Sequence, residues 1–250
     1  MKYVVIIPAK NEEGSIEEVI LSCTNQIIRP QCILIMDNDS NDRTAEIVKA
    51  LKKKDSIIQY FNYKSNSKYS LGGKIVKIFD NGKKYIDQQG IVYDYLAKID
   101  ADISFNNKVF LDISKVIKNK NLGIVSPTAY IKQNNKIIYS STPSWHTTGD
   151  MKIYNKQCYE DIGGLIEDLG WDCADNIAAM EKGYNTEVLS EVFYRQNRPI
   201  GRYSILKGWK RQGIGAYKLR YNYPYIFLKI FHDLFRPPYI IGTIPAQIFY

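Results

Sequence analysis

The sequence predicts an α/β fold with a mostly parallel central sheet flanked by helices and a helical C-terminal extension. Short apolar runs alternate with segments of helical periodicity over the first 130 residues, which is typical of strand–helix–strand units. Of the 250 residues 45% are apolar, enough to bury a full core. Three of the apolar runs lead directly into polar clusters, as at the ligand-binding edge of a parallel sheet.

The first half alternates regularly between strand and helix. Apolar runs predict strands at Tyr3–Ile7, Ile33–Met36, Ile57–Phe61, Tyr95–Ile99 and Gly123–Thr128, the first of them ended by Pro8. Helical spacing of apolar residues predicts helices after Ser15, at about Thr44–Lys53 and from Gly72–Gly73 onward. The first of these helices begins with capping-box spacing between Ser15 and Glu18.

The second half is less regular. It predicts short strands at Lys136–Ser140 and Lys152–Tyr154, a turn at Ile162–Leu165, a helix at Cys173–Lys182 and a last strand at Thr186–Phe193. We therefore expect three parts: a regular half at 1–105, a less regular half of the same domain at 106–197 and an extension at 198–250.

The positive charge is confined to the extension. Residues 1–197 carry 25 Lys and Arg against 25 Asp and Glu, whereas residues 198–250 carry nine basic residues against the single Asp233. Aromatic residues alternate with these basic residues, a composition typical of a segment lying on an anionic membrane surface. Packing against the domain, an oligomer contact and nucleic-acid binding are the alternatives, of which nucleic acid is the least expected.

Cysteine and histidine residues argue against a disulfide framework and a structural zinc site. The four cysteines show no CxxC spacing, and the two histidines, His146 and His232, are far apart. No run reaches 18 apolar residues and no secretory signal precedes the first strand. We expect free thiols and a chain on the cytoplasmic side, at the inner face of the cell membrane.

Two carboxylates at the end of a predicted strand point to a divalent cation. Asp100-Ala101-Asp102 follows the apolar run Tyr95–Ile99, so both aspartates lie on a loop that leaves the sheet. Hard oxygen donors suit Mg²⁺ or Mn²⁺, which keep further coordination positions for water and substrate phosphates. A pair of solvated loop aspartates is the plain alternative.

Four signatures in order resemble family 2 glycosyltransferases with the GT-A fold. They are Val4–Glu13, Ile35–Thr44, Asp100–Asp102, and the block formed by Gly163-Gly164-Leu165, Gly170–Asp175 and Gly183-Tyr184. The second resembles the family pattern Val-Asp-Asp-Gly-Ser-x-Asp-x-Thr. The resemblance covers residues 3–195 and implies an inverting transferase that uses a nucleotide-diphosphate sugar, such as a UDP, GDP or dTDP sugar. It makes residues 1–105 the nucleotide-sugar-binding half and residues 106–197 the acceptor-binding half.

Position by position, the resemblance assigns a nucleoside pocket to Pro8, Ala9, Lys10 and Glu12. Asn38 stands where the family usually has an aspartate that contacts the base, and an amide can both donate and accept there. Lys74 lies at a predicted helix start near the expected phosphates, where an anion is favoured. For Asp39 and Asp42, ordinary turn formation and helix capping is the alternative reading.

The same resemblance makes Asp102 the metal ligand, with Asp100 contacting the metal or the ribose. Many relatives add a histidine ligand after the last strand, but this chain has Tyr194-Arg195-Gln196-Asn197 there, so a third ligand stays unassigned. Arg195 or Arg198 could stabilise the leaving phosphates instead.

Asp172 is the predicted general base, because it lies eleven residues before Gly183, as the catalytic aspartate does in the family. Trp171 and Asp175 are the predicted acceptor contacts, with the indole stacking on a sugar. Acidic residues at a helix N-terminus can also be purely structural.

The function predicted is transfer of a sugar to a hydroxyl of a lipid-linked or surface glycan. An alternative acceptor is a polyprenyl phosphate, since Asp100–Ile103 resembles the Asp-Ala-Asp-Leu run of dolichyl-phosphate mannose synthases, although Ser104 and Phe105 replace their Gln and His. A nucleotidyltransferase and a non-catalytic membrane-binding relative are the other classes that remain open.

Overall fold

The computed structural model describes residues 1–64, 73–117, 121–133 and 135–197, together with the isolated residues 214, 217, 224, 227, 228 and 231. The predicted extension at 198–250 thus lies, apart from those six positions, outside the described residues. Within the described part of the chain, no helix is long and apolar enough to cross a membrane.

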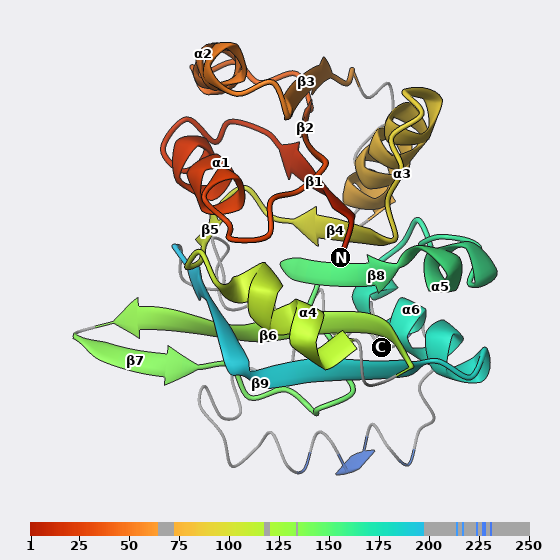
Figure 1. Ribbon diagram of the computed structural model, residues 1–250. Helices are drawn as coiled ribbons and strands as arrows, with labels where there is room; N and C mark the ends of the chain where they lie inside the picture. Colours follow the sequence, from red (N-terminus) through yellow and green to blue (C-terminus); the bar gives the residue numbers. More distant parts are fainter. Residues whose placement is uncertain are drawn as a thin grey trace.

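The first half folds as predicted. Its elements are β1 (Tyr3–Ala9), α1 (Ile16–Thr24), β2 (Cys32–Asp37), α2 (Thr44–Lys54), β3 (Ile58–Asn62), α3 (Gly73–Gln88) and β4 (Tyr95–Ile99). The four strands lie in the order β3-β2-β1-β4, and all three pairings are parallel (Figure 1). Their carboxyl ends therefore meet at one edge of the sheet.

The second half extends the same sheet with mixed pairing. Its elements are β5 (Ile103–Ser104), α4 (Val109–Ile117), β6 (Leu122–Gln133), β7 (Lys136–Tyr139), β8 (Met151–Asn155), α5 (Lys156–Asp161), α6 (Trp171–Glu181) and β9 (Asn185–Gln196). The full order is β3-β2-β1-β4-β8-β6-β9-β5, and β7 pairs with the C-terminal end of β6 as a hairpin outside this order. β8 is antiparallel to both β4 and β6, whereas β6 and β9 are parallel. The predicted α/β class is confirmed, and the sheet is continuous through the β4–β8 pair.

β1 continues two residues past the predicted end. We expected Pro8 to end the strand, but the pairing with β2 runs to Ala9. β4 pairs with β1 only as far as Ile6, so Pro8 has a strand neighbour on one side only. A proline without an N–H is tolerated at such a position.

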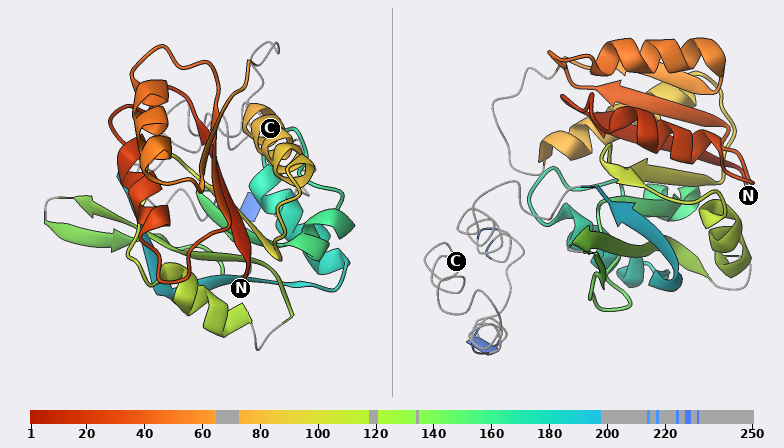
Figure 2. Two further views of the ribbon diagram at one scale, coloured as in Figure 1. Left: turned by 45° about the horizontal axis from the view of Figure 1, so that its top comes forward. Right: turned by 90° about the vertical axis from the view of Figure 1, so that its left-hand side faces the viewer.

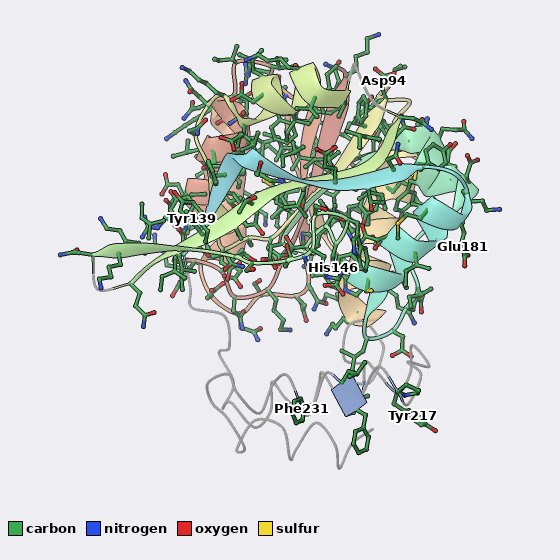
Figure 3. The ribbon with its side chains drawn as sticks, turned by 90° about the horizontal axis from the view of Figure 1, so that it is seen from below. Asp94, Tyr139, His146, Glu181, Tyr217 and Phe231 are labelled. Atoms are coloured by element: carbon green, nitrogen blue, oxygen red, sulfur yellow. The ribbon has the colours of Figure 1, made fainter. Side chains whose placement is uncertain are left out.

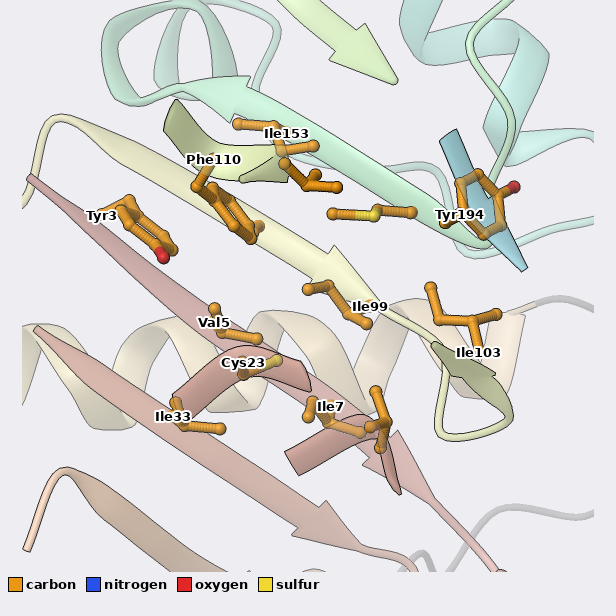
Figure 4. Close-up of a cluster of buried hydrophobic side chains, with 14 of the residues drawn as sticks. Tyr3, Val5, Ile7, Cys23, Ile33, Ile99, Ile103, Phe110, Ile153 and Tyr194 are labelled. Atoms are coloured by element: carbon orange, nitrogen blue, oxygen red, sulfur yellow. The ribbon is translucent and has the colours of Figure 1, made fainter. Parts of the chain in front are cut away.

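Helices cover both faces of the sheet. One core cluster joins α1, α2 and α4 to the sheet, and the second joins α3, α5 and α6 to its other face (Figures 1 and 2). In the first cluster the rings of Tyr3 and Phe110 stack with centroids 4.0 Å apart (Figure 4). α4, for which no element was predicted, buries Val109, Phe110 and Ile113 in this cluster. With both faces covered, the exposed strand ends are left for a ligand.

Candidate active site

The loops after β1 and β2 are bound to each other. The backbone N–H of Asn11 donates to Ser40 Oγ at 2.9 Å, and Asn41 N–H donates to Asn11 Oδ1 at 2.9 Å. Glu12 N–H donates to Thr44 Oγ1 at 2.8 Å. Asn11 adopts a positive φ of 55°, a conformation that asparagine tolerates better than most residues. The first two sequence signatures therefore form a single polar rim.

Two aspartates of the second signature serve the fold. Asp37 is buried and accepts hydrogen bonds from Ser40 N–H at 3.1 Å and from the Tyr60 hydroxyl at 2.7 Å. Asp42 Oδ1 accepts from the N–H and the hydroxyl of Thr44, at 3.0 and 2.5 Å, at the start of α2. Asp42 thus forms a local turn with Thr44, as the structural alternative predicted, and Arg43 occupies the N-cap position of α2.

Asn38 is buried at the centre of this rim, with 4% of its surface exposed. Its N–H donates to the carbonyl of Ala9 at 2.8 Å, and its carbonyl accepts from Lys10 Nζ at 3.2 Å. Its side-chain amide has no hydrogen-bond partner among the described residues, so it is available to a ligand. Pro8 is half-buried beside this position, and the carboxylate of Glu12 accepts from the hydroxyl of Ser15 at 2.9 Å.

Lys74 lies in the first turn of α3, directly after Gly73. Its side chain is half-buried and makes no ion pair with any residue that the structure describes. Residues 65–72, which precede it, lie outside the described part. Its assignment to the phosphates stays a prediction.

The turn that carries the paired carboxylates is held by two other segments. Asp100 N–H donates to the carbonyl of Asp150 at 2.8 Å, and the carbonyl of Asp102 accepts from Asn197 N–H at 3.0 Å. Lys98 Nζ forms an ion pair with Asp100 Oδ1. Burial raises the pKa of Asp100 to about 7, with the charges of Asp150 and Asp102 adding to the rise and that of Lys98 opposing it.

This carboxylate cluster fits a divalent cation only in part. Asp100, Asp102 and Asp150 supply hard oxygen donors of the kind that Mg²⁺ and Mn²⁺ prefer. Asp150 is already engaged, because it accepts from Gln196 Nε2 and, at 3.2 Å, from the Tyr194 hydroxyl. Within residues 1–64, 73–117, 121–133 and 135–197, no three Asp, Glu, His or Cys side chains converge as a complete metal site. A cation held at this turn by Asp102, with Asp100 beside it, would share Asp100 with Lys98 and would take its other ligands from water and substrate.

Asp172 lies in the first turn of α6 and is half-buried. The helix begins after Gly170, whose φ of 82° places it in the left-handed region that favours glycine. The backbone carbonyl of Asp172 accepts from Lys152 Nζ at 2.8 Å and from Asn176 Nδ2 at 2.7 Å. Both bonds end on the backbone carbonyl of Asp172, so neither of them involves its carboxylate.

His146 lies on the same side of the molecule as Asp172. Burial lowers the pKa of His146, and the negative charge of Asp172 opposes this shift. In Figure 3, His146 is labelled nearer the middle of the domain than Asp94, the residue that precedes β4. His146 lies close enough to Asp172 for the charge of that aspartate to act on it.

We predicted that the indole ring of Trp171 stacks on an acceptor sugar, but in the structure this ring is buried. Only 8% of the residue is exposed. Lys98 Nζ and Lys152 Nζ lie 5.3 and 5.5 Å from its ring centroid, within cation–π range. The indole is part of the packing between α6 and the sheet.

Asp175 is likewise not an acceptor contact. Its side chain is 1% exposed, and both carboxylate oxygens lie 2.7 Å from Lys152 Nζ. The Tyr154 hydroxyl donates to Asp175 Oδ2 at 2.6 Å, and Asn176 N–H donates to Oδ1 at 2.7 Å. A carboxylate with all of these partners has a structural role, and the prediction of direct acceptor binding was wrong.

Gly149 joins the two halves of the site. Its carbonyl accepts from Lys98 Nζ at 2.5 Å, and the same ammonium pairs with Asp100. A methyl group at Gly149 would lie 2.9 Å from the ring of Trp171 and 3.4 Å from Cβ of Asp172. Asp100 and Asp172, 72 positions apart in the sequence, therefore flank one short segment.

The chain matches the family model described as glycosyl transferase family 2 over residues 4–174, and it belongs to that family. Among curated proteins, it is similar to 4,4'-diaponeurosporenoate glycosyltransferase of Staphylococcus haemolyticus (strain JCSC1435). The two are 33% identical over 128 residues, which are 50% of this chain and 31% of that protein. The match thus covers less than a third of the relative's length.

Solved structures share the fold at low identity. TarS residues 1–349 of S. aureus, in complex with UDP-GlcNAc, has a TM-score of 0.62 at 18% identity, covering 89% of this chain and 68% of that chain. Mannosyltransferase PcManGT of Pyrobaculum calidifontis, in complex with GDP-Man and Mn²⁺, has a TM-score of 0.66 at 15% identity, covering 99% and 74%. These similarities confirm the predicted GT-A fold.

Sequence reasoning missed four residues of the site: Lys98, His146, Asp150 and Lys152. For the two lysines a signal was present, since each interrupts an otherwise apolar strand, as in Ala97-Lys98-Ile99 and Met151-Lys152-Ile153. A lysine buried in a strand needs a counter-charge. His146 and Asp150 lie on or beside a loop whose position no periodicity indicates.

Proposed function

We propose that this protein transfers a sugar from a nucleotide-diphosphate donor to a hydroxyl group of a lipid-linked or surface glycan, with inversion at the anomeric carbon. The observation that carries the proposal is the convergence of Asp100 and Asp172 on Gly149. It brings a carboxylate suited to the donor's diphosphate region close to a carboxylate suited to take a proton from the acceptor.

The donor side is supported by the rim formed by the loops after β1 and β2. The free amide of Asn38 can bond to a base edge, with Lys10 beside it. Lys74, at the N-terminal turn of α3, can contact the diphosphate. TarS in complex with UDP-GlcNAc and PcManGT in complex with GDP-Man and Mn²⁺ support a nucleotide-diphosphate sugar as the donor.

Asp102 and Asp100 would hold the cation. A bound Mg²⁺ or Mn²⁺ would neutralise charge on the departing nucleoside diphosphate. Lys98 holds the turn that carries Asp100 and Asp102, since its ammonium group bonds to both Asp100 and Gly149.

Asp172 takes the proton of the acceptor hydroxyl as that oxygen attacks the anomeric carbon and the bond to the donor phosphate breaks. Its backbone is held by Lys152 and Asn176. Attachment to a membrane surface through residues 198–250 is part of the proposal and rests on their composition alone.

The test combines binding with turnover. Thermal melting is measured with UDP, GDP and dTDP sugars, each with Mn²⁺ or Mg²⁺, because a ligand that binds only the folded state raises its stability. One donor should raise the melting temperature in the wild type and in Asp172→Asn, but less in Asp102→Asn. Transfer should be lost in both variants. Failure of every donor to bind would contradict the proposal, and full transfer by Asp172→Asn would indicate a phosphate acceptor, which needs no strong base.

A further inference from the structure

A pocket lies at the margin of the sheet, on the face of β9 opposite to Asp150. It is an open hollow of about 500 Å³, lined by residues of α1, β5, the β6–β7 hairpin and the end of β9. The residues that matter here are Glu18, Ser104, Tyr130, Tyr139, Phe193 and Arg195. We call this set the aromatic cradle.

Strand register builds the floor of the cradle. Tyr139 of β7 pairs with Tyr130 of β6, Tyr130 pairs with Arg195 of β9, and Arg195 pairs with Ser104 of β5. Paired residues in a sheet project from the same face, so these four side chains form one row across four strands. Phe193 lies two residues before Arg195 and shares that face.

The cradle has one exposed aromatic ring, that of Tyr139, beside the half-buried rings of Tyr130 and Phe193. Tyr139 is 53% exposed, its ring centroid lies 5.2 Å from that of Phe193 and 6.1 Å from that of Tyr130. Buried aromatic residues stabilise a fold, but exposed ones arranged in a concave site are typical of ligand recognition. These rings offer the stacking surface that Trp171 does not.

Polar groups stand beside the rings. Arg195 is exposed, and no carboxylate lies within ion-pair distance of it in the described residues. Glu18 Oε2 accepts from Asn197 Nδ2 at 2.7 Å, and Ser104 Oγ donates to Asn197 Oδ1 at 3.2 Å. Apolar ring faces with charged and hydroxyl groups at their margin match a sugar, which has C–H faces and a belt of hydroxyls. An acyl or prenyl chain would leave the guanidinium group of Arg195 without a partner, whereas a sugar hydroxyl can accept from it.

The cradle meets the candidate active site at one residue. Asn197, which bonds to Glu18 and Ser104, also donates its N–H to the carbonyl of Asp102 at 3.0 Å. Tyr194 and Gln196 project from the opposite face of β9 and bond to Asp150. A chain of sugars crossing the edge at Asn197 can therefore reach both places.

We propose that the aromatic cradle binds a sugar of an oligosaccharide acceptor that is remote from the reacting hydroxyl. The inference rests on the proposed function for its role in transfer, but glycan binding by the cradle can be measured without turnover. If the cradle binds such a sugar, oligosaccharide acceptors bind more tightly than single sugars, because the remote sugar adds contacts.

The experiment uses the full chain on a printed array of defined oligosaccharides, with affinities of the bound glycans then measured by calorimetry. Tyr139→Ala should weaken binding roughly 3- to 10-fold, the loss typical of one aromatic contact. Arg195→Gln should weaken it about 10-fold, because a charged hydrogen-bond donor is lost. Ile138→Ala is the matched control: Ile138 is 48% exposed on the same strand but faces away from Tyr139, so binding should not change.

The outcomes separate this inference from the proposed function. Equal binding by wild type and Tyr139→Ala, or no glycan bound by a wild-type protein that still binds a nucleotide sugar, overturns the cradle. Glycan binding that depends on Tyr139, without any nucleotide-sugar binding, supports the cradle and refutes the transferase. Circular dichroism of each variant checks that the exposed substitutions leave the fold intact.

Discussion

Lys98 and Lys152 lie directly opposite each other in the antiparallel β4–β8 pair, and both are almost completely buried, at 2% and 0% exposure. Like charges at such positions are destabilising unless each is neutralised. Lys98 pairs with Asp100 and Lys152 with Asp175. Burial lowers the pKa of Lys152, while Asp175 opposes this shift. Lys98 thus holds the turn that begins at Asp100, and Lys152, its neighbour on the next strand, holds the start of α6.

Breaking the buried ion pair between Lys152 and Asp175 should lower the stability of the fold. Lys152→Met should lower the free energy of unfolding by about 3–5 kcal/mol, because Asp175 stays buried without its counter-charge. The double variant Lys152→Met/Asp175→Leu should recover part of the loss, since an apolar replacement of a buried pair is often close to neutral. Urea unfolding of the two single variants and the double variant measures the coupling. Additive losses would contradict the assignment of an ion pair.

Asp172 and Asp175 should differ sharply when changed to asparagine. Asp175→Asn should lower stability by about 3 kcal/mol, because it breaks a buried ion pair. Asp172→Asn should change stability by less than about 0.5 kcal/mol, because its carboxylate accepts no hydrogen bond from any residue that the structure describes and the Lys152 bond uses its backbone carbonyl. Chemical denaturation of both variants measures this. A large loss for Asp172→Asn would show that its carboxylate serves the fold.

Gly149→Ala should disturb the site from its centre. The added methyl would lie 2.9 Å from the Trp171 ring, so Trp171 or Asp172 must move. We expect a stability loss of about 1–3 kcal/mol and a drop in transfer, with donor binding retained. Gly14→Ala is the control, because a methyl there meets no atom within 4 Å. Transfer at wild-type rate in Gly149→Ala would contradict the role of this segment.

Asp80 should make stability fall as pH rises through the acid range. Burial raises the pKa of Asp80, although the Tyr159 hydroxyl donates to it and opposes the rise. The folded state therefore keeps this proton more strongly than the unfolded chain. The stabilisation is complete below the ordinary value of 3.8 and is lost as pH rises through the folded pKa. The melting temperature of Asp80→Asn, measured between pH 3 and 7, should fall less with rising pH than that of the wild type.

Asp161 provides a control of opposite sign. Hydrogen bonds from Tyr184 and Gln157 lower its pKa, so its contribution is present above 3.8 and is lost as pH falls. Asp161→Asn should therefore flatten the acid side of the stability profile. A change in the same direction as Asp80→Asn would contradict both assignments.

Much of the site's placement follows from local pattern. Apolar runs ending in Pro8–Glu13, Asp37–Asp42 and Asp100–Asp102 predicted three polar strand ends, and the structure has β1, β2 and β4 end there. Parallel pairing alone then brings them to one edge. The signature comparison added Asp172, which the structure places beside the same segment as Asp100.

The wrong assignments concern which face of a helix is buried. Trp171, Asp175 and Ala179 recur every four residues and pack against the sheet, whereas Asp172 is turned away from that stripe. The sequence shows the periodicity of the helix and shows that Lys98 and Lys152 interrupt apolar strands, but it does not show that these two strands pack beneath this face of α6. Asp175 became a counter-ion because Lys152 had no water to solvate it.

By itself the amino-acid order determined the alternation of strands and helices, the polar strand ends and the membership of a transferase family, because each depends on neighbours within a few residues. Only the tertiary structure decided that Asp100 and Asp175 pair with buried lysines, whereas Asp172 is bound to Lys152 through its backbone carbonyl alone. That choice depends on contacts between β4, β8 and α6, and the strength of an ionic interaction depends on burial that no local pattern reveals.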